Sequence, residues 1–209
     1  MPHSFKADFV VYCVKPYILE EALKQTKHLL KKNTLILSIA AGKSIKEIKK
    51  VLGAGAAVVR AMPNLPMSVG EGVAGLYAEK NVTAKQRKIC EEVFKNSGIS
   101  FWVKAEKDIT KVTAVSGSSP AYIYAMVDAL ETVCADYGFD KKTSADIAAK
   151  ILTGCAKLLK ESKLTPKELN KNIATPGGTT EAALKVLGKN KALYKLTKKA
   201  ADAAKDRFK

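Results

Sequence analysis

The first hundred residues alternate between short, continuously apolar runs and longer segments in which apolar residues recur every three or four positions. A run of four to eight apolar residues closed by proline or glycine is typical of a strand that is buried on both faces of a sheet. The predicted strands are Phe9–Val14, Thr34–Ala40, Ala57–Ala61, Val73–Ala78 and Ile99–Val103.

The segments between these strands have helical spacing. Helices are predicted over Tyr17–Leu30, Ile45–Leu52 and Thr83–Ser97. Ser44 followed three residues later by Glu47 is a capping box that fixes the start of the second helix. Because strands alternate with helices, the pattern predicts an α/β domain with a largely parallel sheet.

After Glu106 the pattern becomes helical throughout. Ala121–Tyr137 is apolar on nearly all sides, so it is predicted to be buried on most of its surface. About 100 residues offer little to bury such a helix, and a partner subunit is therefore expected. Further helices are predicted from Thr143 to about Lys160, from the Thr165–Glu168 capping box onward, at about Glu181–Leu187 and at about Lys191–Phe208. The expected domains are residues 1–105 and 106–209.

The composition fits an ordinary globular protein, since 47% of the 209 residues are hydrophobic and 27% are charged. No apolar run approaches the 18 residues that a membrane-spanning helix needs, and the N-terminus does not resemble a secretory signal. The four cysteines form no CxxC pair and are expected to be small hydrophobic core residues in a reducing, cytoplasmic environment. With only two histidines, a metal site is not expected.

The net charge of +16 raises the possibility of a nucleic-acid partner. Only three basic residues are arginines, namely Arg60, Arg87 and Arg207, whereas base recognition and phosphate forks favour arginine. The lysines are scattered, so a solvated basic surface is the preferred interpretation and neither nucleic acid nor a membrane is expected as a partner.

Three strand ends carry candidate ligand-binding residues. Val14-Lys15-Pro16 follows the first strand, Ala40-Ala41-Gly42 the second, and Asn64 lies between two prolines after the third. Ligands of open α/β sheets bind beyond the carboxyl ends of the strands, where small residues admit a flat cofactor. Each loop is also compatible with a purely structural turn, and for Asn64 both interpretations remain open.

The segment Thr175-Pro176-Gly177-Gly178-Thr179-Thr180 is the most informative local signal. Two glycines before a helix leave backbone amides directed outward at the positive end of the helix dipole, which suits a small carboxylate or phosphate. The Thr180 hydroxyl can both donate and accept. A simple glycine turn with a threonine cap is the alternative.

Other catalytic signatures are absent from the sequence. It contains no G-x-G-x-x-G, no G-x-x-x-x-G-K-[ST] and no G-x-S-x-G. With His3 and His28 as the only histidines, nucleophilic catalysis by a triad is not expected.

Six strings, taken in order, resemble pyrroline-5-carboxylate reductases. They are DFVVYCVKP (residues 8–16), SIAAG (38–42), VRAMPNLP (59–66), VGEG (69–72), TAVSGSSPAY (113–122) and TPGGTT (175–180). The resemblance implies a Rossmann-like sheet domain followed by a helical domain that joins two subunits, with higher assemblies built from the dimers. It also implies reduction of 1-pyrroline-5-carboxylate to L-proline by NADPH or NADH.

The resemblance further implies roles for individual residues. Val14, Lys15, Pro16, Ala40, Ala41 and Asn64 would line the cofactor, with Asn172 reaching it from the helical domain. Thr175 and the backbone of Gly177, Gly178, Thr179 and Thr180 would hold the substrate carboxylate. The Thr180 hydroxyl would bond the ring nitrogen and so act in catalysis.

The chain departs from the family pattern at Leu65, where threonine is usual, and at Ser119, where glycine is usual. The resemblance also implies that the chain starts at the fourth Rossmann strand, so that about 60 residues of two βαβ units, with the glycine fingerprint, would be missing. A non-catalytic dimerisation module of the same family is therefore the alternative function.

Overall fold

The computed structural model describes residues 5–207. Internal contacts group the chain into two compact units, residues 1–120 with 201–209, and residues 121–200. The first unit includes the segment 106–120, which the sequence analysis assigned to the second domain. As a division into domains, the boundary at residue 105 stays a prediction.

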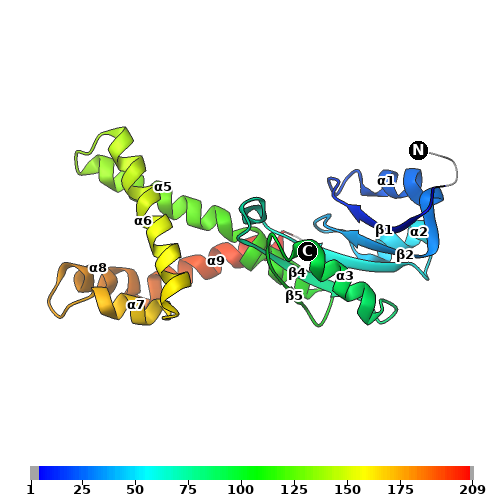
Figure 1. The fold of residues 1–209 in the computed structure, drawn as a ribbon. Helices are drawn as coiled ribbons and strands as arrows, with labels where there is room; N and C mark the ends of the chain where they lie inside the picture. The colour runs from blue at the N-terminus through cyan, green and yellow to red at the C-terminus, as the bar shows by residue number, and fades with distance from the viewer. Residues whose placement is uncertain (1–4, 208–209) are drawn as a thin grey trace. The chain divides into compact units, whose positions relative to one another are not determined.

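The sheet of the first unit has, within residues 5–207, five strands in the order β1-β2-β3-β4-β5 (Figure 1). Neighbouring strands are parallel except β3 and β4, which are antiparallel. The sheet is therefore mixed, though mainly parallel as predicted. The bounds are β1 (Ala7–Tyr12), β2 (Leu30–Ser38), β3 (Ala57–Met62), β4 (Gly72–Ala78) and β5 (Gly98–Trp102).

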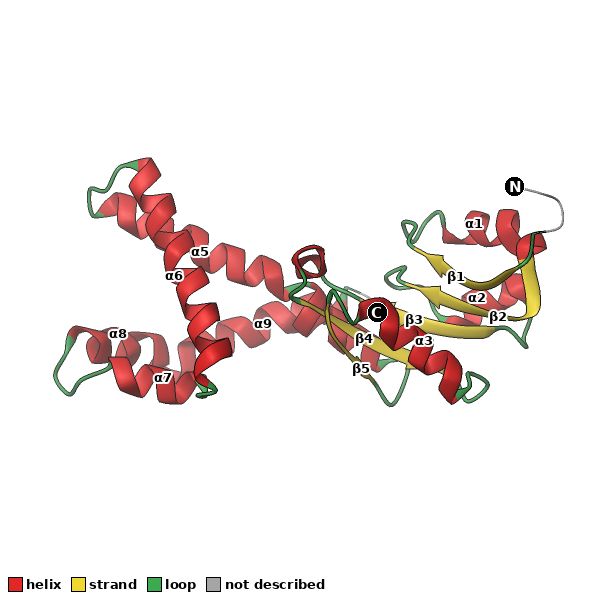
Figure 2. Ribbon diagram, viewed as in Figure 1, coloured by secondary structure: helices red, strands yellow, loops and turns green. Residues whose placement is uncertain are grey.

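Helices lie on both faces of this sheet (Figure 2), and each face has its own apolar cluster. On one face Ile36 and Val58 pack with Leu23 of α1 and Ile48 of α2. On the other face the cluster includes Phe94 of α3. The bounds are α1 (Leu19–Thr26), α2 (Ile45–Leu52), α3 (Ala84–Phe94), α4 (Asp108–Val112), the 3-10 helices η1 (Lys27–Leu29) and η2 (Leu65–Val69), and the π-helical turn η3 (Thr113–Gly117).

Helix α4 lies directly on β4. A Cβ placed on Gly75 would come within 2.6 Å of the Val112 side chain, so this close approach requires glycine. Tertiary packing thus joins the segment after residue 105 to the sheet.

Local signals fix several helix starts. The predicted capping box of Ser44 and Glu47 is confirmed, and Thr83 forms a second box with Gln86. The predicted helix over Tyr17–Leu30 is shorter, because α1 ends at Thr26 and residue 30 already begins β2. The single turn η1 between them explains the error, since its Leu29 continues the helical spacing.

The second unit is helical. Its elements are α5 (Ser119–Asp136), α6 (Lys141–Ser162), α7 (Pro166–Ile173), α8 (Thr179–Gly188), the turn η4 (Lys189–Lys191) and α9 (Ala192–Asp206), of which α5 begins and α9 ends in the first unit. The capping box of Thr165 and Glu168 is confirmed. The predicted start of α6 at Thr143 is wrong, because Asp140 accepts from the amides of Lys142 and Thr143.

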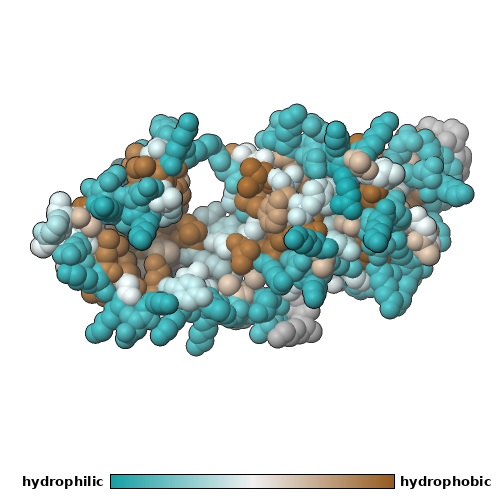
Figure 3. Space-filling view, turned by 90° about the horizontal axis from the view of Figure 1, so that it is seen from below, coloured by the Kyte–Doolittle hydropathy of each residue, from teal (hydrophilic) through white to brown (hydrophobic). Residues whose placement is uncertain are grey.

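The prediction that residues 121–137 are mostly buried is wrong for the single chain. Within α5 the structure buries Cys134, whereas Tyr124 and Met126 are more than half exposed. In Figure 3 apolar side chains (brown) lie at the surface of this unit, at the left of the view. The helix is apolar as predicted, but much of its apolar surface is left uncovered by residues 5–207.

Cysteine burial agrees with expectation at two positions. Cys90 and Cys134 are buried, whereas Cys13 and Cys155 are exposed and so are not core residues. Across residues 5–207 no group of histidine, cysteine or carboxylate side chains is placed to hold a metal ion. No helix in this part of the chain is long and apolar enough to cross a bilayer.

Candidate functional site

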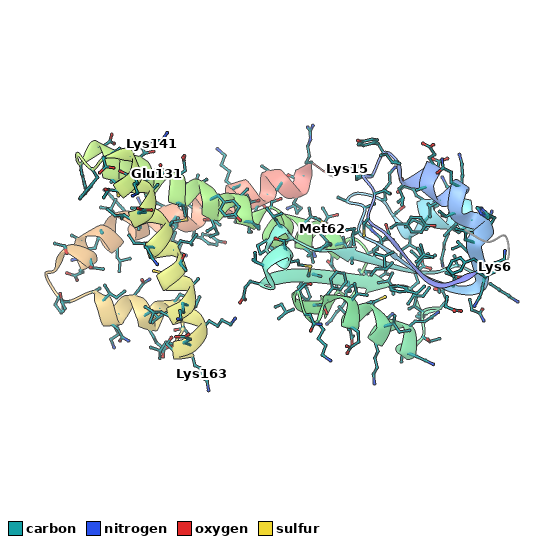
Figure 4. The ribbon with its side chains drawn as sticks, turned by 45° about the horizontal axis from the view of Figure 1, so that its top comes forward. Lys6, Lys15, Met62, Glu131, Lys141 and Lys163 are labelled. Atoms are coloured by element: carbon teal, nitrogen blue, oxygen red, sulfur yellow. The ribbon has the colours of Figure 1, made fainter. Side chains whose placement is uncertain are left out.

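The predicted cofactor residues of the first unit gather at one edge of the sheet. β1, β2 and β3 are neighbours and run parallel, with Tyr12 opposite Ser38 and Ser38 opposite Arg60. The segments that follow these three positions therefore leave the sheet side by side. Figure 4 labels Lys15 after β1 and Met62 at the end of β3.

The loop after β1 combines a packed and an open part. Val14 packs against the apolar cluster of α1 and α2, while the Lys15 side chain is exposed. The Lys15 carbonyl accepts from the Ile18 amide at 3.0 Å, so Pro16 lies in a turn that leads into α1. The turn leaves the lysine side chain in solvent, where it can reach an anionic ligand.

The loop after β2 is fixed by a buried side chain and by a backbone hydrogen bond. Ala40 is buried, and its carbonyl accepts from the Lys43 amide; Ala41 is half-buried. Two small side chains at this position leave the backbone accessible to a flat ligand.

Glu106 anchors the helix that follows this loop. Its Oε1 accepts from the Ile45 amide at 2.7 Å and from Arg60 Nη1 at 2.9 Å. The Arg60 side chain is only 11% exposed, so the carboxylate is paired where water has little access. The anchor ties α2, β3 and the segment after β5 together, and the sequence offered no local signal for it because the partners are 46 and 61 residues away.

Asn64 has a structural role in this edge. Its Oδ1 accepts from the Val73 amide at 2.8 Å, and its Nδ2 donates to the Ser116 carbonyl at 3.3 Å. The side chain thus joins the end of β3 to the start of β4 and to η3. It also borders an open cleft of about 390 Å³, which Cys13 and Met67 help to line. Both interpretations of Asn64, as a structural residue and as a wall of a cleft, are compatible with this geometry.

The predicted anion-binding turn lies in the second unit. The Gly178 amide donates to the Thr175 carbonyl at 2.9 Å, which closes the turn. Gly177 has φ of +74°, a left-handed conformation that favours glycine. A Cβ on Gly178 would lie 2.5 Å from Thr175 Oγ1, so this position also excludes a side chain. Both glycines are required by the turn itself.

The turn leads directly into α8, with Gly178 as the N-cap. No side chain caps the first amides of α8, so the alternative of a threonine cap is wrong. The first amides of a helix have no intrahelical acceptor, and their dipoles favour an anion. The exposed Thr179 and half-buried Thr180 open the helix.

A carboxylate of the chain already binds at this turn. Glu181 Oε2 accepts from the Gly177 amide at 2.9 Å and lies 3.2 Å from Lys185 Nζ. The geometry shows that the turn accepts a carboxylate, but the partner is internal. Sequence reasoning missed this role, although an acidic residue in the first turn of a helix was its signal.

Asn172 is exposed on α7, in the same unit as the turn. The structure therefore assembles the predicted residues in two groups. Val14–Pro16, Ala40–Ala41 and Asn64 form the carboxyl edge of the sheet, and Asn172 belongs to the unit of Thr175–Thr180. A joint site of the two groups stays a prediction.

Known proteins resemble the chain over nearly its full length. Residues 106–209 match the family described as pyrroline-5-carboxylate reductase dimerisation. The pyrroline-5-carboxylate reductase of Haemophilus influenzae is 35% identical over 184 residues, which cover 88% of this chain and 68% of the relative. The Pseudomonas aeruginosa reductase is 35% identical over 201 residues, which cover 96% of this chain and 73% of that protein.

Solved structures agree. A pyrroline-5-carboxylate reductase from Coxiella burnetii superimposes with a TM-score of 0.90 at 36% identity, covering 98% of this chain and 76% of that one. A pyrroline carboxylate reductase from Plasmodium falciparum, solved with NADP bound, gives 0.82 at 32% identity and covers 96% and 76%.

Proposed function

This chain belongs to the pyrroline-5-carboxylate reductase family, and from that premise we propose that it reduces 1-pyrroline-5-carboxylate to L-proline with NADPH or NADH. It is then an oxidoreductase of the last step of proline biosynthesis. The observation that carries the proposal is the match of 35% identity over 96% of the chain. A match of this extent includes both the strand-end loops and the glycine turn.

The carboxyl edge of the sheet fits a nicotinamide cofactor. β1-α1-β2-α2-β3 is the unit that binds one mononucleotide in dinucleotide-binding folds, and the small side chains of Ala40 and Ala41 leave room beside the backbone. Val14, Lys15, Pro16, Ala40, Ala41 and Asn64 would line the cofactor, and Asn172 would contact it from the helical unit. When bound, the reduced nicotinamide ring supplies the hydride.

The turn at residues 175–180 suits the carboxylate of the substrate. Thr175 and the amides from Gly177 to Thr180 would hold it at the positive end of the α8 dipole. The bond between the Gly177 amide and Glu181 supports this assignment, because a carboxylate oxygen already accepts at this position. The substrate carboxylate would take the place of the Glu181 side chain.

The Thr180 hydroxyl would act on the ring nitrogen. In the protonated imine, the carbon next to nitrogen accepts the hydride and the C=N double bond becomes a single bond. The nitrogen keeps its proton and becomes the amine of proline. Thr180 would hold that nitrogen in place, so catalysis consists of positioning and oriented donors and needs no strong base.

The match of residues 106–209 to the dimerisation family supports a homodimer. We extend this to higher assemblies built from dimers, in the cytoplasm, without nucleic acid as a partner. The exposed apolar side chains of α5 and α6 provide the surface that such contacts need.

The activity is tested by following NADPH and NADH oxidation at 340 nm with 1-pyrroline-5-carboxylate. We expect substrate-dependent oxidation, and Thr180→Ala should lower kcat about 10- to 100-fold because it removes the hydroxyl from the reacting nitrogen. Thr179→Ala is the matched control, since Thr179 would contribute only its amide. A wild-type chain that oxidises neither cofactor, yet is folded and dimeric, would favour the non-catalytic module instead.

A further inference from the structure

One buried side-chain polar atom within residues 5–207 has no hydrogen-bond partner. The Ser116 hydroxyl is inaccessible and unpaired, and the residue as a whole is 9% exposed. Native structures seldom leave a buried hydroxyl unpaired, because its desolvation is then not compensated. Such a group calls for a partner that arrives from outside the chain.

The backbone around Ser116 explains why the helix does not satisfy it. η3 is a π-helical turn, closed by the Ser118 amide donating to the Thr113 carbonyl at 2.8 Å. The hydroxyls of Thr113 and Ser119 donate to carbonyls four residues earlier, at 2.9 and 2.8 Å. Ser116, between them, makes no such bond. Single π-helical turns inside helices occur frequently at functional sites.

Ser116 lies at the edge of the sheet that we assign to the cofactor. Its carbonyl accepts from Asn64 Nδ2, and Asn64 follows β3 directly. The next residue, Gly117, is so close to Met62 that an added Cβ would lie 2.8 Å from the Met62 Cε atom. The unbranched Met62 side chain is flexible and can change its rotamer without a backbone movement. A ligand that approaches the buried hydroxyl from the end of β3 would require such a rotamer change.

We propose that the Ser116 hydroxyl is a cofactor-binding group that forms a hydrogen bond with the carboxamide of the nicotinamide ring; this inference rests on the proposed function. A hydroxyl donates and accepts, and a carboxamide offers both a carbonyl and an amino group. Arg60, two residues before Met62 on β3, is already paired with Glu106. A neutral amide therefore suits this buried position better than the substrate carboxylate, which would bring an uncompensated charge.

The test compares Ser116→Ala with wild type in two measurements that do not depend on turnover. Without ligand, the melting temperature of Ser116→Ala should be unchanged or higher, because the lost hydroxyl had no partner. The Kd of NADPH, from fluorescence titration, should rise about fivefold for one lost hydrogen bond. Ser119→Ala is the matched control: its exposed hydroxyl bonds only to its own helix, so the Kd should not change.

Fragments locate the contact. Ser116→Ala should raise the Kd of nicotinamide mononucleotide about as much as that of NADPH, and it should leave the Kd of 2′,5′-ADP unchanged. If instead the Kd of L-proline alone rises, the hydroxyl belongs to the substrate site and the proposal is overturned. Ser116→Cys, which retains the volume but is a weak donor, should show an intermediate Kd and guards against a packing defect in the alanine variant.

The possible failures are distinguishable. If the unliganded Ser116→Ala protein melts several degrees lower and binds NADPH normally, the hydroxyl is structural and this inference fails alone. If the wild-type chain gives no fluorescence change or thermal shift with NADPH or NADH, the proposed function fails for this chain, and the inference fails with it.

Discussion

The two units of this chain differ in how far their apolar residues are buried. In the first unit, Leu37, Val59 and Leu76 are fully buried, and both faces of the sheet have a closed cluster. Across residues 121–200 the buried residues are Cys134, Ser144 and Ala148, while Tyr137 and Val186 are 80% and 72% exposed.

Burial of apolar surface is the main favourable term in folding, so this difference concerns stability. The sheet unit contains its own core, whereas the helical unit exposes the residues that would form one. Because residues 106–209 match a family described as dimerisation, we expect a second copy to cover those residues. In this chain the helical unit is expected to depend on a second copy, and the sheet unit much less.

Met126→Glu is expected to have the largest effect on this comparison. Met126 on α5 is 53% exposed, so a charge costs little in the single chain. If a second copy covers it, an unpaired carboxylate becomes buried at a cost of about 3 kcal/mol, which weakens the dimer about 100-fold. Light scattering after size-exclusion chromatography should show a shift from dimer to monomer.

Ile99→Glu is the control in the sheet unit. Ile99 on β5 is even more exposed, at 64%, and lies outside the region described as dimerising. Its variant should keep the mass of the wild type. If both variants dissociate equally, or if neither dissociates, the exposed apolar residues of the helical unit are not a specific dimer interface.

The sequence predicted what short-range chemistry determines. The capping boxes at Ser44 and Thr165 lie where predicted, because their partners are three residues apart. The strand-end loops could also be placed, since parallel neighbours share an edge. Local patterns therefore located most elements and both candidate groups.

Features that depend on distant partners could not be predicted. The Glu106 anchor joins residues that only the fold brings together. The residue spacing of α5 predicts an apolar helix but does not identify the surface that covers it. At the start of α6 both Asp140 and Thr143 are suitable N-cap residues. Asp140 is the N-cap because its side chain accepts from the first amides of the helix. For Glu181 the sequence shows an acidic residue in the first helical turn, but its bond to the Gly177 amide depends on the folded conformation of the turn.

The capping boxes allow a comparison of the units by pH. The Ser44 amide donates to Glu47 and lowers the pKa of this carboxyl from 4.5 to about 2. A lowered pKa in the folded state means that the contribution is complete above pH 4.5 and is lost as the pH falls towards 2. Because the Glu47 side chain is 45% exposed, we expect a contribution of only about 1 kcal/mol.

Glu47→Gln isolates this contribution, because Gln86 shows that glutamine completes the same box without a charge. Urea unfolding should find the variant less stable above pH 5 and equal to wild type near pH 2. The Thr165 hydroxyl likewise lowers the pKa of Glu168. We therefore expect Glu168→Gln also to be less stable than wild type above pH 5 and to lose this difference at low pH. A pH dependence that is larger for Glu168 than for Glu47 would contradict the large lowering of the Glu47 pKa.

Glu181→Ala is expected to have the smallest effect and separates the two candidate groups. Glu181 accepts from the Gly177 amide, where the proposed substrate carboxylate binds. Removing this internal competitor frees the amide and takes away a like charge, so the KM for 1-pyrroline-5-carboxylate should fall about threefold, or about 0.6 kcal/mol. The KM for NADPH should stay constant, because Glu181 is not among the residues assigned to the cofactor.

Glu161→Ala is the control for the loss of one surface charge. Glu161 is paired with Lys157 at 3.9 Å on α6, and its removal should leave both KM values unchanged. If Glu181→Ala raises the KM for the substrate, the carboxylate maintains the turn instead of competing for it. The substrate would then bind a turn that Glu181 has already shaped, and the first amides of α8 would have to hold the carboxylate without the Gly177 amide.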